Sequence, residues 1–121
     1  MNPTFPLLDR EAIDNLRAIN PDDGGEFLRE LIDIFLVDTP KHLADLEAAI
    51  AAGQSVDLTR AAHSIKGSSG NFGATGLANL ARDMESLGKA SEFAAAGQAL
   101  PGLRAEFLRL HPALEQLRKA G

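Results

Sequence analysis

Hydrophobic residues recur along this chain at the spacing of α-helices, and the apolar–polar alternation that marks β-strands is nearly absent. Ala, Leu, Glu and Arg, which favour helix, dominate the sequence. We expect a first short helix after Asp9, whose carboxylate can cap it. The stretch 20–25, rich in Asn, Pro, Asp and Gly, predicts a break after that helix. The apolar face of this first helix consists of Ala12, Ile13 and Leu16.

A long second helix is predicted to follow the break and to end at Gly53, because glycine commonly terminates helices. Pro40 lies inside this helix, in the segment Asp38-Thr39-Pro40. Since proline removes a backbone donor and clashes with the preceding turn, we expect a kink or a brief interruption there. The apolar positions of this helix are Phe27, Leu28, Leu31, Ile32, Phe35, Leu43, Leu46 and Ile50.

Two further helices follow. The third opens at Ser55 or Asp57 and runs to about Gly70. A short turn at 71–75 leads into a fourth helix that ends near Gly88. The apolar stripe of the fourth helix consists of Leu77, Leu80, Ala81, Met84 and Leu87.

The last helical stretch has a less regular first half. Ser91 can cap it, and the stretch reaches Lys119. Pro101 can begin a helix rather than sit inside one, and Pro112 can bend the second half. The apolar face of this stretch consists of Leu103, Phe107, Leu110, Leu114 and Leu117.

Short connections between long amphipathic helices imply that neighbouring helices run antiparallel. The predicted fold class is therefore all-α: an antiparallel up-and-down four-helix bundle, at about residues 8–119, with a short additional N-terminal helix that caps one end. A length of 121 residues suits a single domain covering 1–121, and a helical domain of that size can bury a core without metals or crosslinks.

Composition and charge narrow the class of protein. The chain has no cysteine, which excludes disulfides and thiolate metal sites. Its net charge of −5 disfavours nucleic acid and anionic membranes as partners. No apolar run approaches the roughly 20 residues needed to span a bilayer, and the segment 1–6 lacks the features of a signal peptide. We therefore expect a cytoplasmic protein.

The segment around His63 carries the chemistry. On a helical wheel the apolar residues of the third helix gather on one side and His63 points to the other. Gly67 and Gly70 share the face of His63, four and seven residues further on. Each glycine costs a helix about 1 kcal/mol relative to alanine. We infer a bare surface on which the backbone of another protein can approach the imidazole. The inward side consists of Leu58, Ala61, Ala62, Ile65, Ser69 and Phe72.

Two cations flank this histidine along the helix, Arg60 three residues before it and Lys66 three residues after it. Such a basic spot attracts a phosphoryl group and stabilises its oxygens during transfer. Histidine side chains titrate near neutral pH, so a ring nitrogen is available as a nucleophile. Positioning and charge neutralisation account for most of the catalysis in phosphoryl transfer.

Glu85 lies on the flank of the fourth helix, where an antiparallel neighbour can set its carboxylate against His63. A carboxylate that accepts from Nδ1–H fixes the tautomer and leaves Nε2 as the nucleophile. The site has no carboxylate cluster for Mg²⁺ and no glycine-rich loop for a nucleotide. We therefore expect no cofactor on this chain, and the missing parts must come from a partner.

Other polar residues near the histidine are assigned to the surface that a partner covers. Ser68 and the neighbouring Ser69 can contact phosphate, but helix-end serines more often satisfy backbone groups or pack. His42 and His111 lack the glycines that accompany His63, and we interpret them as surface residues. The predicted partner surface consists of Ser64, Ser68, Gly70, Arg82 and Lys89.

The segment 62–69, Ala-His-Ser-Ile-Lys-Gly-Ser-Ser, resembles the AH-x-LKGSS motif of histidine-containing phosphotransfer (HPt) domains, with Ile65 in place of the usual leucine. The segments 35–40, 71–74 and 80–85 are also similar to that family, and the resemblance covers roughly residues 8–118. Members of this family are four-helix bundles with the active histidine exposed on one helix.

The resemblance also implies roles for single residues. The phosphorylated histidine of the family falls on His63, its phosphate-proximal lysine on Lys66 and its close-approach glycine on Gly67. The position that hydrogen-bonds the active histidine falls on Glu85. HPt domains exchange phosphoryl groups with aspartates of response-regulator receiver domains, some of them in hybrid sensor kinases, and Mg²⁺ belongs to the receiver. The resemblance therefore implies a monomeric phosphoryl carrier rather than an enzyme.

Three alternatives stay open at this stage. The bundle could act as an adaptor that binds and inhibits a partner without being phosphorylated. An enzyme could use His63 and Glu85 as a catalytic pair, although enzyme pockets are concave and this site is expected to be convex. The chain could also be a piece of a chemotaxis-type kinase, in which an ATP-binding domain phosphorylates the histidine.

Overall fold

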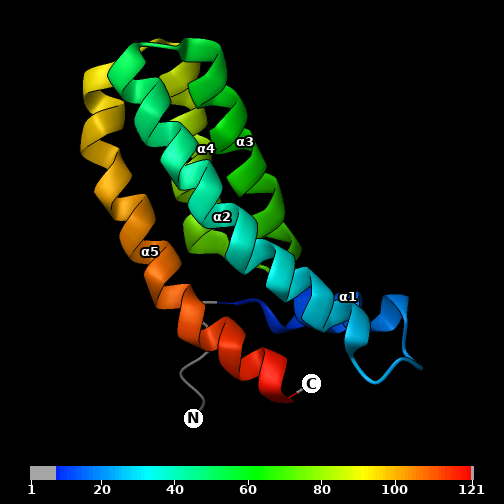
Figure 1. Ribbon diagram of the computed structural model, residues 1–121. Helices are drawn as coiled ribbons and strands as arrows, with labels where there is room; N and C mark the ends of the chain where they lie inside the picture. Colours follow the sequence, from blue (N-terminus) through cyan, green and yellow to red (C-terminus); the bar gives the residue numbers. More distant parts are fainter. Residues whose placement is uncertain (1–7, 121) are drawn as a thin grey trace.

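The computed structural model describes residues 8–120, and the regular structure in that range consists of helices (Figure 1). The all-α prediction is confirmed. None of the helices in the described range is long and apolar enough to cross a membrane. The helices are α1 (Arg10–Ile19), α2 (Glu26–Ala52), α3 (Ser55–Asn71), α4 (Thr75–Lys89) and α5 (Phe93–Ala120).

The helices α2 to α5 form the predicted up-and-down bundle. Each packs against the next helix in sequence, and α5 returns beside α2 to close the bundle. The short helix α1 lies at one end, against α2 and α3 (Figure 1). The expected four-helix bundle with a short additional N-terminal helix is therefore confirmed, and α3 has α2 on one flank and α4 on the other.

The core between these helices is mostly aliphatic, and its aromatic part joins three segments of the chain. The ring of Phe35 from α2 lies 5.4 Å from that of Phe72 and 5.9 Å from that of Phe107. Burial of each large apolar side chain contributes about 1.5–3 kcal/mol to folding. The most completely buried apolar side chains are Leu28, Ile32, Leu46, Leu58, Ile65, Leu77, Met84, Leu103, Leu110 and Leu114.

The prolines do not interrupt the helices, so a brief interruption at Pro40 and a helix that begins at Pro101 are both wrong as predictions. α2 continues through Pro40, and α5 begins well before Pro101 and continues through Pro112. All three prolines are exposed. Each proline leaves one carbonyl, a turn earlier in the helix, without a backbone N–H donor. This carbonyl lies on the same outward face, where water can donate a hydrogen bond to it. An outward proline is therefore tolerated where a buried one would break the helix.

The helix ends match the sequence in part. Asp9 caps α1 by accepting from the backbone N–H of Glu11 at 3.0 Å, and Gly53 ends α2 in the left-handed conformation, both as predicted. Ser91 does not cap α5, because its φ of 57° places it in the turn before Glu92 and the helix begins at Phe93.

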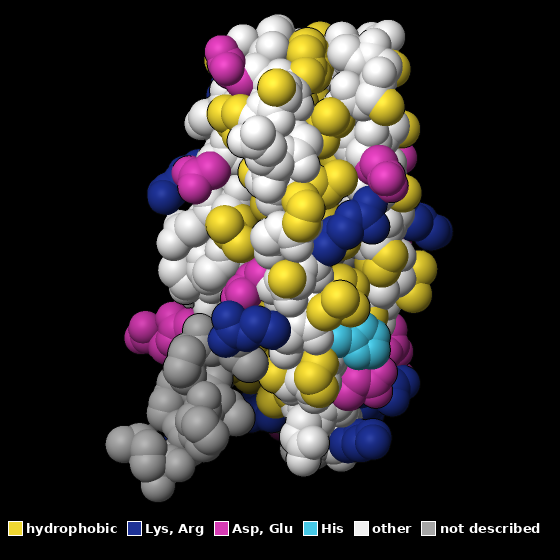
Figure 2. Space-filling model, turned by 90° about the vertical axis from the view of Figure 1, so that its left-hand side faces the viewer, with side chains coloured by type: hydrophobic (Ala, Val, Ile, Leu, Met, Phe, Trp, Pro, Cys, Tyr) yellow, Lys and Arg dark blue, Asp and Glu magenta, His cyan; other side chains and the backbone are white. Residues whose placement is uncertain are grey.

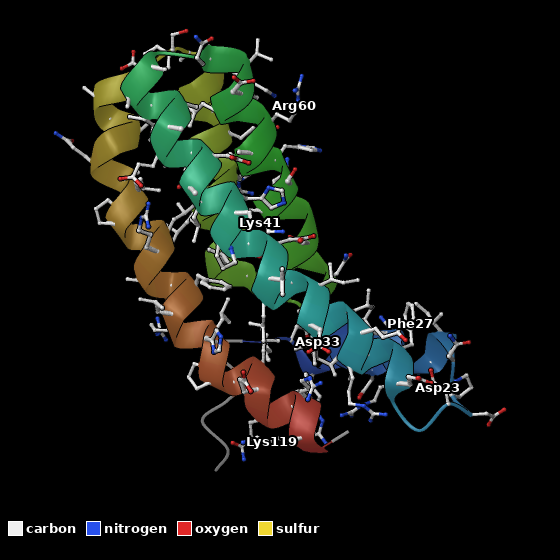
Figure 3. All side chains as sticks on the ribbon, in the orientation of Figure 1. Asp23, Phe27, Asp33, Lys41, Arg60 and Lys119 are labelled. Carbon is white, nitrogen blue, oxygen red and sulfur yellow. The ribbon has the colours of Figure 1, made fainter. Side chains whose placement is uncertain are left out.

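The cap of α2 was not predicted from the sequence. Asp23 accepts from the backbone N–H groups of Gly25 and Phe27, each at 2.9 Å, and so caps α2 from inside the predicted break. Figure 3 shows Asp23 and Phe27 at the start of this helix.

Candidate functional site

His63 projects from the outer face of α3, as the helical wheel predicts. Its side chain is 66% exposed, while all the residues assigned to the inward side of α3 are buried. The imidazole is therefore available to a partner, and its backbone is held by a helix that packs on both flanks.

The predicted contact between the histidine and α4 is present. Nδ1 of His63 lies 3.0 Å from Oε2 of Glu85. The other oxygen, Oε1, pairs with Nζ of Lys66 at 2.7 Å. Nζ of Lys89, in the last turn of α4, is 3.8 Å from Oε2. One carboxylate thus holds the imidazole and a lysine at the same time. The helical wheel predicts the contact of Glu85 with His63 but not the contact with Lys66.

The charge state of this carboxylate fixes the histidine tautomer. The hydrogen bond from Lys66 lowers the pKa of Glu85 below its ordinary value, burial opposes this effect, and His63 adds to the lowering. Glu85 is therefore ionised at neutral pH and can only accept hydrogen bonds. Nδ1 of His63 must carry the proton, which leaves the lone pair of the neutral ring on Nε2.

Gly88 allows α4 to come close enough for this contact. A Cβ on Gly88 would lie 2.6 Å from Oγ1 of Thr59 and 3.1 Å from its backbone nitrogen. The hydroxyl of Ser55 also donates to the carbonyl of Gly88 across the same interface. Glu85 lies one turn earlier on α4, opposite His63. The sequence indicated Gly88 only as a helix end, because its packing role depends on the neighbouring helix.

Gly67 and Gly70 have no such role inside the molecule. Both are exposed, and a Cβ built on either would meet no atom within 4 Å. Packing in this chain therefore does not require glycine at these positions. The predicted bare surface beside His63 is confirmed, and its space is open to a partner.

The serines on α3 are engaged with their own helix. The hydroxyl of Ser64 donates to the carbonyl of Arg60 at 3.2 Å, and that of Ser68 donates to the carbonyl of Ser64 at 2.9 Å. The helix-end interpretation of Ser68 agrees with this geometry. Ser69 is buried, and its hydroxyl has no hydrogen-bond partner among the described residues.

The other residues that the sequence singles out differ in their exposure and contacts. Arg60 is exposed, and Figure 3 shows it projecting from the outer side of α3. Arg82 is exposed on α4 and does not contact the Glu85 carboxylate. His42 and His111, interpreted as surface residues, are half-buried, and the ring of His111 packs edge-on against Phe107 at 6.1 Å.

An open depression of about 500 Å³ lies beside His63, between the first half of α3 and the end of α4. The site is therefore not purely convex, although the depression is open to solvent rather than enclosed. Among the described residues, no group of three or more His, Asp or Glu side chains could hold a metal ion. The depression is lined by Ser55, Val56, Thr59, Arg60, His63, Ser64, Glu85 and Lys89.

A helical bundle that exposes a histidine backed by a carboxylate has the features of a phosphotransfer protein. The family model of the Hpt domain matches residues 30–120, and the chain belongs to this family. It is thus a member of the histidine phosphotransfer proteins that act in phosphorelays.

The comparison with solved structures agrees. The chain is similar to the crystal structure of histidine-containing phosphotransfer protein B (HptB) from Pseudomonas aeruginosa PAO1, with 30% identity and a TM-score of 0.86. The match covers 96% of this chain and 97% of that one. A search of the curated proteins gives no match.

The packing of Gly88 predicts opposite effects for two glycine substitutions. Gly88→Ala forces the two helices apart and should lower the free energy of unfolding by about 1–3 kcal/mol. Gly102→Ala, in open space on α5, should raise it by about 0.5–1 kcal/mol through helix propensity. Urea unfolding followed by circular dichroism measures both, and equal stabilities for the two variants would contradict the packing role.

The lowered pKa of Glu85 predicts a pH dependence of stability. A carboxylate whose pKa is lower in the folded state stabilises the fold above its unfolded value, and this contribution is lost as pH falls through the folded pKa. Glu85→Gln should therefore lower the free energy of unfolding by about 1–3 kcal/mol at pH 7. The difference from wild type should shrink steadily below pH 4.5, the ordinary value.

The control is Asp83→Asn, an exposed carboxylate on the same helix that forms no ion pair within the described range. Urea unfolding at a series of pH values should show a small and constant difference for this variant. A difference for Glu85→Gln that is equally constant from pH 7 to pH 3 would contradict the stabilising role of the Glu85 charge.

Proposed function

We propose that this protein is a phosphorelay intermediate in which Nε2 of His63 takes a phosphoryl group from the aspartate of one receiver domain and passes it to another receiver domain. The observation that carries the proposal is the contact between Nδ1 of His63 and the ionised carboxylate of Glu85, with Nε2 left toward solvent.

The chemistry follows from this tautomer. The lone pair of Nε2 attacks phosphorus, the N–P bond forms, and the bond between phosphorus and the aspartate oxygen breaks, so that the aspartate leaves as a carboxylate. The ring becomes cationic because Nδ1 keeps its proton. Glu85, already 3.0 Å away, stabilises that positive charge without any movement of a proton. The same steps run in reverse toward the second receiver.

The cations around the histidine support the transfer of a charged group. Lys66 and Lys89 both lie within 4 Å of Glu85, and Arg60 lines the depression that contains His63. Positive charge of this kind offsets the charge of the phosphoryl oxygens during transfer. In this proposal Mg²⁺ is held by the receiver, and the carrier has no nucleotide site of its own.

The partners follow from this chemistry. They are response-regulator receiver domains, including those of hybrid sensor histidine kinases. Nucleic acid and membrane are not part of the proposal, which treats the protein as a cytoplasmic monomer. The adaptor and enzyme alternatives differ from the relay in that neither requires a phosphorylated His63.

Labelling separates the relay from the adaptor. Purified receiver domains encoded in the same genome are phosphorylated with labelled acetyl phosphate and mixed with the protein. Wild type should become labelled by at least one receiver, because His63 is exposed to a docked aspartyl phosphate. His63→Gln should stay unlabelled, whereas His42→Gln, the matched control on α2, should be labelled like wild type. Absence of label on wild type with every receiver would refute the relay.

Glu85→Ala tests the role of the carboxylate in the chemical step. Phosphoramidate, a small phosphoryl donor of histidine, avoids any effect on docking. Without Glu85 the ring loses its orientation and its counter-charge, so the rate of His63 labelling should fall about tenfold to a hundredfold. Asp83→Ala serves as the control on the same helix. An equal rate for wild type and Glu85→Ala would show that the contact does not assist the reaction.

A further inference from the structure

Val56 is an exposed apolar side chain on the face of α3 that carries His63. It is 68% exposed, more than any other large apolar side chain in the described range. It lies seven residues before His63, which places it on the same side of the helix, about 10 Å along the axis. Gly70 lies at the same spacing on the other side of the histidine. The stripe Val56, His63, Gly70 therefore runs along one side of the helix, with a drift of about 20° at each step.

The two halves of this stripe differ. After His63 the surface is bare, because Gly67 and Gly70 present no side chain. Before His63 the surface is the open depression of about 500 Å³, and Val56 is its exposed large apolar residue. Single exposed apolar residues are common on proteins. The position of Val56 is unusual because it shares one depression with the reactive histidine.

Two cations border this depression. Arg60 forms no ion pair in the part of the chain that the structure describes. Lys89 is 68% exposed, and its distance of 3.8 Å to Glu85 is much longer than the 2.7 Å of Lys66. Both cations can therefore turn to an acidic partner. A second copy of this chain would bring like charges together, which disfavours self-association through this surface.

Geometry places Val56 within reach of any protein that acts on His63. A specific interface buries at least about 500 Å² on each partner, which corresponds to a patch of roughly 13 Å radius. Val56 lies about 10 Å from His63 along α3, and so falls inside a patch centred on the histidine. The same patch includes Arg60, which lies between Val56 and His63 along α3.

We propose that Val56 is a docking contact for the receiver domain that exchanges phosphoryl with His63. The receiver segment that covers it carries an apolar side chain next to carboxylates, which pair with Arg60 and Lys89. This inference rests on the proposed relay function and names the chemistry of the surface by which that partner binds. The side chain of Val56 contributes to binding and takes no part in the chemical step.

The test compares Val56→Ser with Leu108→Ser. Leu108 is matched in exposure, at 66%, but lies on α5. Figure 2 shows the side of the bundle that α5 forms, where apolar side chains are scattered among charged ones. Initial rates of transfer from a phosphorylated receiver that labels wild type, measured over a range of receiver concentrations, give KM and kcat for each variant.

Val56→Ser should raise KM about fivefold or more with little change in kcat, because it removes apolar contact from the docked complex. Its effect on receiver-dependent transfer should exceed its effect on labelling by phosphoramidate by a similar factor. Leu108→Ser should leave KM within twofold of wild type. Equal KM values for the two serine variants would overturn the contact while leaving the relay intact. Failure of every receiver to label wild type would overturn the relay and this contact together.

A second arm tests the acidic character of the partner. Arg60→Ala should raise KM and make it less sensitive to salt between 50 and 300 mM, because an ion pair across the interface is lost. Lys119→Ala is the control, since Figure 3 shows Lys119 at the far end of the molecule from Arg60. A salt dependence for Arg60→Ala that equals that of wild type and Lys119→Ala would overturn the pairing with acidic groups.

Discussion

The site depends on the charge of one nearly buried carboxylate. A buried charge is costly unless it is paired, and the two closest partners of Glu85 are Nδ1 of His63 and Nζ of Lys66. Both partners come from α3, while Glu85 comes from α4, so the same contacts that satisfy the charge also fix how the two helices align. Gly88 makes this alignment possible by removing the side chain that would separate the helices. The packing of α3 against α4 and the orientation of the His63 ring therefore depend on the same contacts.

Much of this arrangement could be predicted from helical periodicity. The outward direction of His63 follows from the position of its neighbours on α3, and the contact with Glu85 follows once two antiparallel helices are assumed. The pairing of Lys66 with Glu85 could not be predicted, because it depends on the distance between the helices rather than on spacing within one. Pro101 was misleading for a similar reason, since its exposure in the bundle decides whether a helix tolerates it. The sequence pattern within one helix predicts which way a side chain points. The contacts between helices depend on how the helices pack.

The openness of the site suits a carrier. Enzyme active sites are commonly enclosed pockets, but the imidazole of His63 is two-thirds exposed, and its depression is open to solvent. A carrier must present the same atom to a donor and then to an acceptor, which requires that neither partner stay bound for long. A small contact surface around one exposed histidine favours such brief complexes. The exposure that would weaken an enzyme therefore permits exchange between two partners.

The charge around His63 also suits a phosphoryl carrier. The protein carries a net charge of −5, yet the charged residues that line the depression of His63 or pair with Glu85 are Arg60, Lys66, Lys89 and Glu85 itself, which sum to +2. A phosphoryl group brings about −2, while the ring gains one positive charge. In the proposed relay, phosphorylation of His63 therefore lowers the local charge from +2 to about +1 without making it negative. The phosphoryl group would then lie in a positive environment on a negative protein, where the rest of the carrier would not repel it.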